Sequence, residues 1–166
     1  MEQAVRAKEL QLVVFQLANE TYGVDIAKVS EIRELQKITR VPRCPDFIEG
    51  IINLRGRVIP VVDLRTRFGL PAGERTANTR IVVVEIGGHT IGVIVDEVLE
   101  VLSVAGDAVE PTPPVITGLE ADYLLGVAKL DDRLVILLEL DRVLSRNEQS
   151  ALMEGAYANG ALDKAV

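Results

Sequence analysis

Short apolar segments separated by turn-forming residues run along most of the chain. They are rich in Val, Ile and Leu, and clusters of β-branched residues about four to eight positions long are typical of strands. In the first half these segments are residues 10–17, 21–26, 27–35, 48–54 and 58–64. The segment 27–35 also fits a helical stripe, and its match to a later strand segment favours a strand.

The second half follows the same plan. Its apolar segments are residues 80–86, 90–95, 98–104, 123–130 and 133–140. Gly87-Gly88 in this half and Arg55-Gly56 in the first half predict tight hairpin turns. Pro60 lies inside a strand segment and predicts that this strand is at a sheet edge, because proline has no N–H to donate. Short helices are expected at residues 63–68 and from Asp141 onward.

The two halves also match each other residue by residue. A shift of 69 places residues 15–32 on residues 84–101, and a shift of 76 places residues 50–64 on residues 126–140. A unit of roughly 70 residues used twice predicts two similar lobes, and the seam between two lobes is a natural binding place. About five short strands in each lobe favour a small Greek-key or SH3-like barrel, since closure removes exposed sheet edges.

Composition narrows the classes of partner. Apolar residues make up 48% of the 166 residues and aromatic residues only 4%, so the core consists of Val, Ile and Leu. A net charge of −7 argues against nucleic acid and anionic membrane surfaces, because both require a basic face. The single Cys44 allows no internal disulfide, and residues 1–10 contain no apolar stretch typical of a signal peptide or membrane anchor. We therefore expect a cytoplasmic protein.

Candidates for catalysis are few. His89 is the only histidine, and it lies in a Gly-Gly-His-Thr turn without a recognisable supporting group. Cys44 has Arg43 beside it, which can lower the pKa of a thiol, but no second cysteine or neighbouring histidine accompanies it. One His and one Cys give no metal-ligand spacing, and no glycine-rich phosphate-binding loop occurs. We expect no catalytic, cofactor or metal site and no enzymatic activity.

The most informative difference between the halves lies in the turn Asn53-Leu54-Arg55-Gly56. The second half has Lys129-Leu130-Asp131-Asp132 at these positions, whereas Glu31 and Glu100 are the same residue in both halves. If the lobes fold alike, the first brings Glu31 near Arg55 and the second brings Glu100 near Asp131. Only the first of these pairs attracts.

Arg55 is then either an ordinary charge at a hairpin tip or a recognition residue held in place by Glu31. A surface ion pair contributes only about 0–1 kcal/mol, so stability alone is a poor reason for one here. Orienting a planar side chain with several N–H donors toward a partner is a better reason.

Four blocks in register carry a family resemblance. They are Tyr22-Gly23-Val24-Asp25-Ile26, Asn53-Leu54-Arg55-Gly56, Ile59-Pro60-Val61-Val62-Asp63-Leu64 and Ile91-Gly92-Val93-Ile94-Val95-Asp96. Together they closely resemble the CheW family of chemotaxis coupling proteins. The resemblance covers about residues 10–145.

This resemblance implies an all-β fold with minor helices. Two five-stranded SH3-like barrels related by internal duplication pack together, with a C-terminal helix. Within a single domain, residues 1–166, lobe one is expected at about residues 10–78 and lobe two at about residues 79–145, partly intertwined. Residues 146–166 form a C-terminal helix or tail.

The resemblance also implies what the protein binds. The family has no enzymatic activity and bridges the cytoplasmic tips of methyl-accepting chemoreceptors to the regulatory domain of the chemotaxis histidine kinase. By position, Arg55 and Glu31 match charged residues that the family uses in receptor and kinase coupling, and Asn53 and Gly56 in the turn of Arg55 are also expected to take part in binding. The side chains expected close to the apolar inter-lobe groove for the receptor are those of Val29, Ile32 and Val98. The protein is expected to be a monomer in isolation and to join receptor arrays at the inner membrane without entering it.

Two other functions remain open at this point. A duplicated-barrel enzyme would bind a small ligand in the same seam and use His89 or a carboxylate. A closed pocket with a titratable group of perturbed pKa would distinguish it from an open apolar groove. Nucleic-acid binding by small barrels meets the obstacle of the net charge of −7 and the scarcity of aromatic residues.

Overall fold

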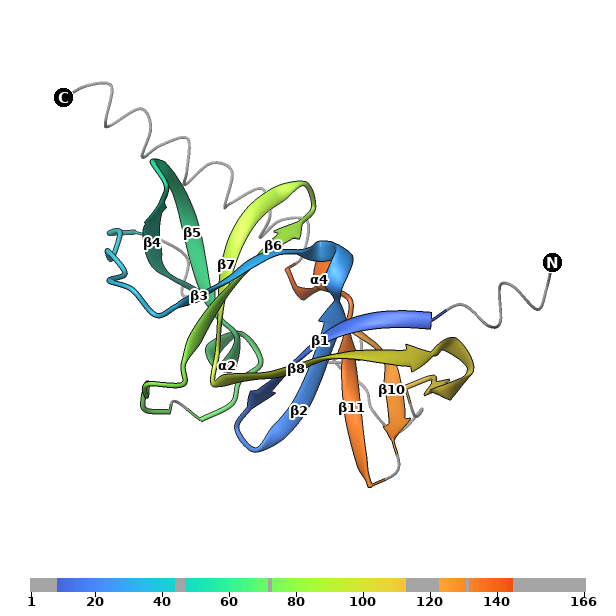
Figure 1. Ribbon diagram of the computed structural model, residues 1–166. Helices are drawn as coiled ribbons and strands as arrows, with labels where there is room; N and C mark the ends of the chain where they lie inside the picture. The colour runs from blue at the N-terminus through green and yellow to red at the C-terminus, as the bar shows by residue number, and fades with distance from the viewer. Residues whose placement is uncertain (1–8, 44–46, 72, 113–122, 131, 145–166) are drawn as a thin grey trace.

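A computed structural model of the protein describes residues 9–43, 47–71, 73–112, 123–130 and 132–144, which form two β-sheets side by side (Figure 1). Sheet A has the order β8-β1-β2-β11-β10-β9, with β1 Glu9–Leu17, β2 Glu20–Asp25, β8 Glu97–Ala105, β9 Val109–Glu110, β10 Leu124–Leu130 and β11 Arg133–Leu138. Sheet B has the order β3-β6-β7-β5-β4, with β3 Val29–Glu34, β4 Ile48–Leu54, β5 Arg57–Asp63, β6 Arg80–Ile86 and β7 His89–Val95. Short helical turns join them: η1 Ile26–Lys28, α2 Leu64–Arg67, η2 Gly106–Ala108 and α4 Leu140–Val143.

The sheets are built to one plan from exchanged strands. A shift of 76 residues carries β4, β5 and α2 onto β10, β11 and α4, and a shift of 69 carries the β1–β2 hairpin onto β6–β7. The β1–β2 hairpin nevertheless pairs with β8 and β11 of the second half, whereas β6–β7 pairs with β3 and β5 of the first half. Each sheet therefore combines strands from both halves of the chain.

Three apolar cores explain why the strands are continuously apolar. Val13 and Phe15 of β1 face a central core that both sheets share, whereas Leu12 and Val14 face a core inside sheet A. On β6, Val82 and Val84 join the central core, whereas Ile81 and Val83 face a core inside sheet B. Because successive side chains point to opposite faces of a strand, β1 and β6 bury both faces.

Gly23 and Gly92, which are equivalent under the shift of 69, lie where a neighbouring strand leaves little room for a side chain. A Cβ on Gly92 of β7 would lie 2.9 Å from Cγ2 of Ile81, and a Cβ on Gly23 of β2 would lie 3.1 Å from Cγ1 of Val135. Both distances are shorter than ordinary van der Waals contact. Without a Cβ, the backbone of each glycine lies close against a side chain of the neighbouring strand.

The prediction that Pro60 places its strand at a sheet edge is wrong, because β5 lies between β4 and β7. The parallel ladder with β7 begins only at Val61, so it requires no N–H from Pro60. On the other side, Pro60 stands opposite Ile51. The N–H and C=O of Ile51 both bond to Thr39 instead, at 2.8 and 2.9 Å. An interior strand therefore accommodates the proline.

The predicted hairpins and the helix that begins after Asp63 are confirmed, and the two SH3-like lobes agree with the fold class expected from the sequence. Sheet A carries the short β9 in addition to five strands equivalent to those of sheet B. Residues 1–8 and the expected C-terminal helix or tail at residues 146–166 lie outside the described residues, as does Cys44. Among the helices of the described segments, none has the length and apolar character needed to cross a membrane.

Candidate functional site

The turn that presents Arg55 is a two-residue hairpin loop between β4 and β5. Arg55 and Gly56 both have positive φ angles, 51° and 86°, the pattern of a tight turn that matches the strand twist. The Oδ1 atom of Asn53 accepts a hydrogen bond from the backbone N–H of Gly56 at 2.7 Å. Asn53 and Gly56 thus fix the backbone from which the Arg55 side chain projects.

Glu31 and Arg55 form a two-point ion pair, as the comparison of the halves predicts. Nη1 of Arg55 donates to Oε1 of Glu31 at 3.1 Å, and Nη2 donates to Oε2 at 2.6 Å. The Arg55 side chain remains 68% exposed, whereas that of Glu31 is 23% exposed. The carboxylate holds one edge of the guanidinium, and the rest of the group faces solvent.

Both members of this pair stay charged near neutral pH. Hydrogen bonds from Arg55 and then from Arg33 lower the pKa of Glu31 below its usual value. The hydrogen bond to Glu31 raises the pKa of Arg55 further. The site therefore offers an oriented cation rather than an acid or base that exchanges protons.

Two further residues, Arg33 and Gln36, complete the network, and sequence reasoning missed them. Nη1 of Arg33 donates to Oε1 of Glu31 at 3.0 Å, and Nε of Arg33 donates to Oε1 of Gln36 at 3.3 Å. Nε2 of Gln36 donates to the carbonyl oxygen of Asn53 at 3.1 Å, which ties the segment after β3 to the end of β4. The position of Arg33 two residues after Glu31, on the same strand face, is the signal that could have identified it.

The second lobe contains an ion pair at the matching glutamate, Glu100. Glu100 accepts a hydrogen bond from Nη2 of Arg133 on β11. Arg133 is the counterpart of Arg57 and reaches Glu100 from the strand beyond the turn, a contact that the comparison of the two halves does not predict. Asp131, the expected neighbour of Glu100, lies outside the described residues.

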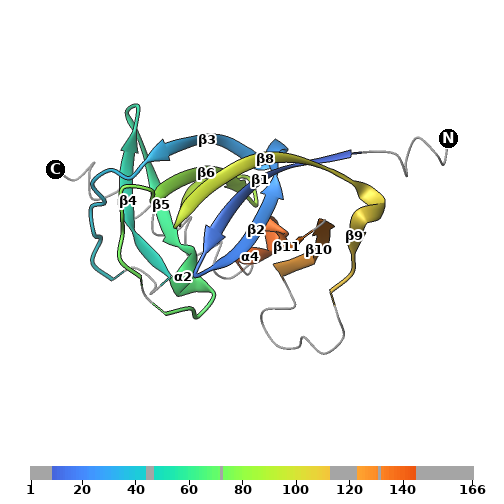
Figure 2. The ribbon, with the colours of Figure 1, turned by 60° about the horizontal axis from the view of Figure 1, so that its bottom comes forward.

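The apolar candidates lie on the outer strands of the two sheets, and Figure 2 shows β3 and β8 running along the same side of the molecule. Val29 and Val98 are partly buried against the central core. Ile32 stands opposite Val82 and is 41% exposed. Ile32 follows Glu31 in β3, so the two side chains point to opposite faces of the strand.

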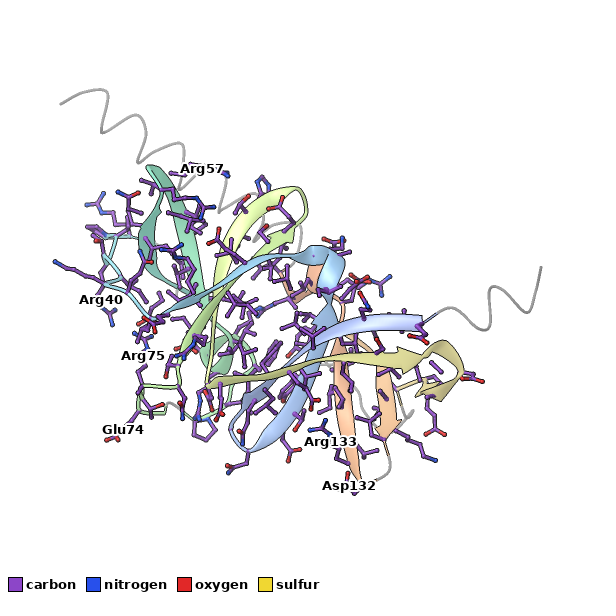
Figure 3. The ribbon with its side chains drawn as sticks, in the orientation of Figure 1. Arg40, Arg57, Glu74, Arg75, Asp132 and Arg133 are labelled. Atoms are coloured by element: carbon purple, nitrogen blue, oxygen red, sulfur yellow. The ribbon has the colours of Figure 1, made fainter. Side chains whose placement is uncertain are left out.

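Exposed apolar residues occur at matching positions of the two lobes. Ile32 corresponds to Val101 under the shift of 69, and Val58 corresponds to Leu134 under the shift of 76. The exposed fractions are 41% and 57% for the first pair and 59% and 58% for the second. Exposed apolar side chains at the same position in both lobes indicate contact surfaces. The hairpin tips near Arg57 and Asp132 lie at opposite ends of the molecule (Figure 3).

A hollow of about 100 Å³ lies in sheet A among β1, β2, β10 and β11, away from Arg55. Its lining includes Asp25, Lys28 and Glu139. The hydrogen bond to Asp141 and the charge of Asp141 raise the pKa of Lys28, which makes the amine a poor base. Across the part of the chain that the structure covers, no cluster of three or more His, Cys, Asp or Glu side chains could hold a metal ion. Nothing in these segments supports the enzyme alternative.

Comparison with known proteins agrees with this arrangement. The family model described as CheW-like domain matches residues 11–148. The chain is 38% identical over 144 residues to the chemotaxis protein CheW of Klebsiella aerogenes, covering 87% of this chain and 86% of that protein. It is 35% identical over 150 residues to the chemotaxis protein CheW of Bacillus subtilis, covering 88% and 94%. The crystal structure of the scaffolding protein TtCheW from Thermoanaerobacter tengcongensis superposes with a TM-score of 0.78 at 42% identity, covering 85% of this chain and 96% of that chain.

Proposed function

The chain belongs to the CheW-like family, and we propose that it is a chemotaxis adaptor that performs no reaction itself. The two relatives described above are chemotaxis proteins, and the match covers most of the length of each. The relative of known structure is a scaffolding protein. The candidate site supports this function, because it holds an oriented cation and exposed apolar side chains instead of acid–base groups.

In this proposal the protein connects the cytoplasmic tips of transmembrane chemoreceptors to the regulatory domain of the chemotaxis histidine kinase. The receptor tip binds the seam near Val29, Ile32 and Val98, and Arg55 with Glu31 contributes to coupling. The protein is cytoplasmic and monomeric in isolation, and it is recruited to receptor arrays at the inner membrane. Each contact is modest in strength, because assembly into arrays multiplies weak contacts.

The observation that carries this proposal is the geometry of Arg55. Its guanidinium is held at two points by Glu31 and yet is 68% exposed, on a loop with a positive φ angle. A surface ion pair contributes about 0–1 kcal/mol, so stabilisation is a weak reason to keep this arrangement. A guanidinium fixed along one edge is well suited to bind a carboxylate or carbonyl group of another protein.

The test is capture of purified kinase regulatory domain and receptor fragment by the immobilised chain. We expect Arg55→Glu to reduce capture about tenfold or more while the circular dichroism spectrum stays unchanged. Lys129→Glu is the matched control, because it makes the same change of charge at the equivalent of Asn53 in the other lobe. Capture by Arg55→Glu at the level of the control would remove Arg55 from the binding site.

A further inference from the structure

Two ion pairs outside the candidate site connect the two sheets, and the carboxylate of each also accepts a backbone N–H from a hairpin turn. We call these two groups of contacts the first clasp and the second clasp. In the first clasp, Nε and Nη2 of Arg65 on α2 donate to the carboxylate of Asp96, which follows β7, at 2.8 and 2.5 Å. The same carboxylate accepts the backbone N–H of Ala18, in the β1–β2 turn of sheet A, at 2.9 Å. Burial would raise the pKa of Asp96, but these hydrogen bonds lower it below its usual value. The first clasp therefore ties both sheets to a charged carboxylate.

The second clasp lies at the other junction of the two sheets. Asp141 on α4 accepts the backbone N–H of Gly87, in the β6–β7 turn, at 3.0 Å. It also accepts a hydrogen bond from Nζ of Lys28 on η1 at 2.9 Å. The hydrogen bonds from Gly87 and Lys28 lower the pKa of Asp141.

The two clasps occupy matching positions with opposite charges. Arg65 corresponds to Asp141 under the shift of 76, and Ala18 corresponds to Gly87 under the shift of 69. In the first clasp the helical residue is the cation and the residue after the hairpin is the anion, whereas in the second the helical residue is the anion. Lys28 lies after β2 and Asp96 lies after β7. Under the shift of 69, Lys28 falls one position after Asp96, because the turn η1 follows β2.

The duplication gives the chain an alternative way to pair its strands. Because the β1–β2 and β6–β7 hairpins have the same apolar pattern, β1–β2 could pair with β3 and β5, and β6–β7 with β8 and β11. Each half would then form its own sheet through more local contacts. In that arrangement β5 pairs with β2, which brings Arg65 on α2 near Lys28 and away from Asp96. Likewise β11 pairs with β7, which brings Asp141 on α4 near Asp96.

We propose that the opposite charges of the two clasps select the exchanged pairing of strands over the pairing within each half. In the exchanged structure both clasps are attractive, and in the alternative both bring like charges together. Like charges at fixed sites oppose an alternative structure even when its apolar packing is equally good. Clasps of equal polarity would stabilise both arrangements alike.

The test compares reversal of one clasp with reversal of both. Arg65→Asp with Asp96→Arg restores an ion pair within the first clasp but gives both clasps the same polarity. Lys28→Asp with Asp141→Lys does the same from the second clasp. All four substitutions together restore opposite polarity. Each protein is diluted from urea, and the recovered native monomer is quantified by size-exclusion chromatography and by its amide NMR spectrum.

We expect each single-clasp reversal to lower the recovered native monomer about two- to fivefold, the range of one partly exposed ion pair. The fourfold variant contains every local defect of both, including loss of the acceptor for the Ala18 N–H, and it should nevertheless recover close to wild type. A fourfold variant that recovers no better than the single reversals would overturn the proposal. Single reversals that recover like wild type would overturn it too.

Discussion

At the scale of the residue, Arg55 stands where its own conformation is unfavourable. Its φ of 51° lies in the left-handed region, where Gly, Asn and Asp are common and Arg is not. The other half has Asp at the equivalent position, so the turn itself does not require Arg. The side chain is therefore best explained by what it presents to a partner, with Glu31 and Arg33 as the groups that orient it.

Exchanging the charges of Glu31 and Arg55 tests whether the two residues act through their ion pair or whether each charge acts independently. We expect Glu31→Arg and Arg55→Glu each to weaken capture of the kinase regulatory domain, because each places two like charges together. The double variant should recover part of the lost binding, since it rebuilds the ion pair with reversed polarity. The measurement is a double-mutant cycle of dissociation constants. If the two losses simply add, Glu31 does not act through Arg55.

The immediate neighbours of Glu31 show how far residue-level prediction reaches. The sequence predicts its contact with Arg55, because the halves differ in charge there while they share Leu54. It does not predict the contact of Glu100 with Arg133, because a long side chain reaches a site that the turn alone does not define. Conformational freedom of arginine makes such contacts hard to infer from position.

At the scale of the element, the strands follow from the apolar pattern and their pairing does not. The sequence predicts β4 and β5 within about one residue, and it favours a strand for residues 27–35, where the structure has the end of η1 followed by β3. The apolar pattern does not predict that the two hairpins are exchanged between the sheets. The β1–β2 and β6–β7 hairpins have apolar residues at equivalent positions, so either could pair with β5. Pro60 also gives a misleading signal for an edge strand, because the parallel ladder between β5 and β7 begins only after it, at Val61.

The two strand glycines give a test of packing at this scale. Gly92→Ala should lower the free energy of unfolding by about 1–3 kcal/mol, because its Cβ would meet Cγ2 of Ile81 at 2.9 Å. Gly23→Ala is the matched control, with the nearest contact at 3.1 Å, and it should be less destabilising. Urea unfolding followed by circular dichroism measures both. A larger loss at Gly23 than at Gly92 would contradict this account of the two crossings.

At the scale of the whole molecule, charge is distributed unevenly along the duplicated chain. Residues 29–95, which include the strands of sheet B, contain ten Lys or Arg and seven Asp or Glu. Residues 9–28 and 96–144, which include the strands of sheet A, contain four and fourteen. Arg40, Arg57 and Arg75 lie on the sheet B lobe, and Asp132 lies at the far tip of the sheet A lobe (Figure 3). Two lobes of one shape but opposite charge discriminate between partners, since complementary potential sets partner choice. This property suits an adaptor that joins two different proteins.

The most direct test of the central claim is reconstitution of the connection itself. Receptor-containing membrane vesicles and purified kinase are mixed with and without the chain, and the kinase in the pellet is measured after sedimentation. We predict that the kinase sediments with the vesicles only when the chain is present, and that Arg55→Glu abolishes most of this effect. Kinase that sediments equally without the chain, or that stays in solution with it, would contradict an adaptor function.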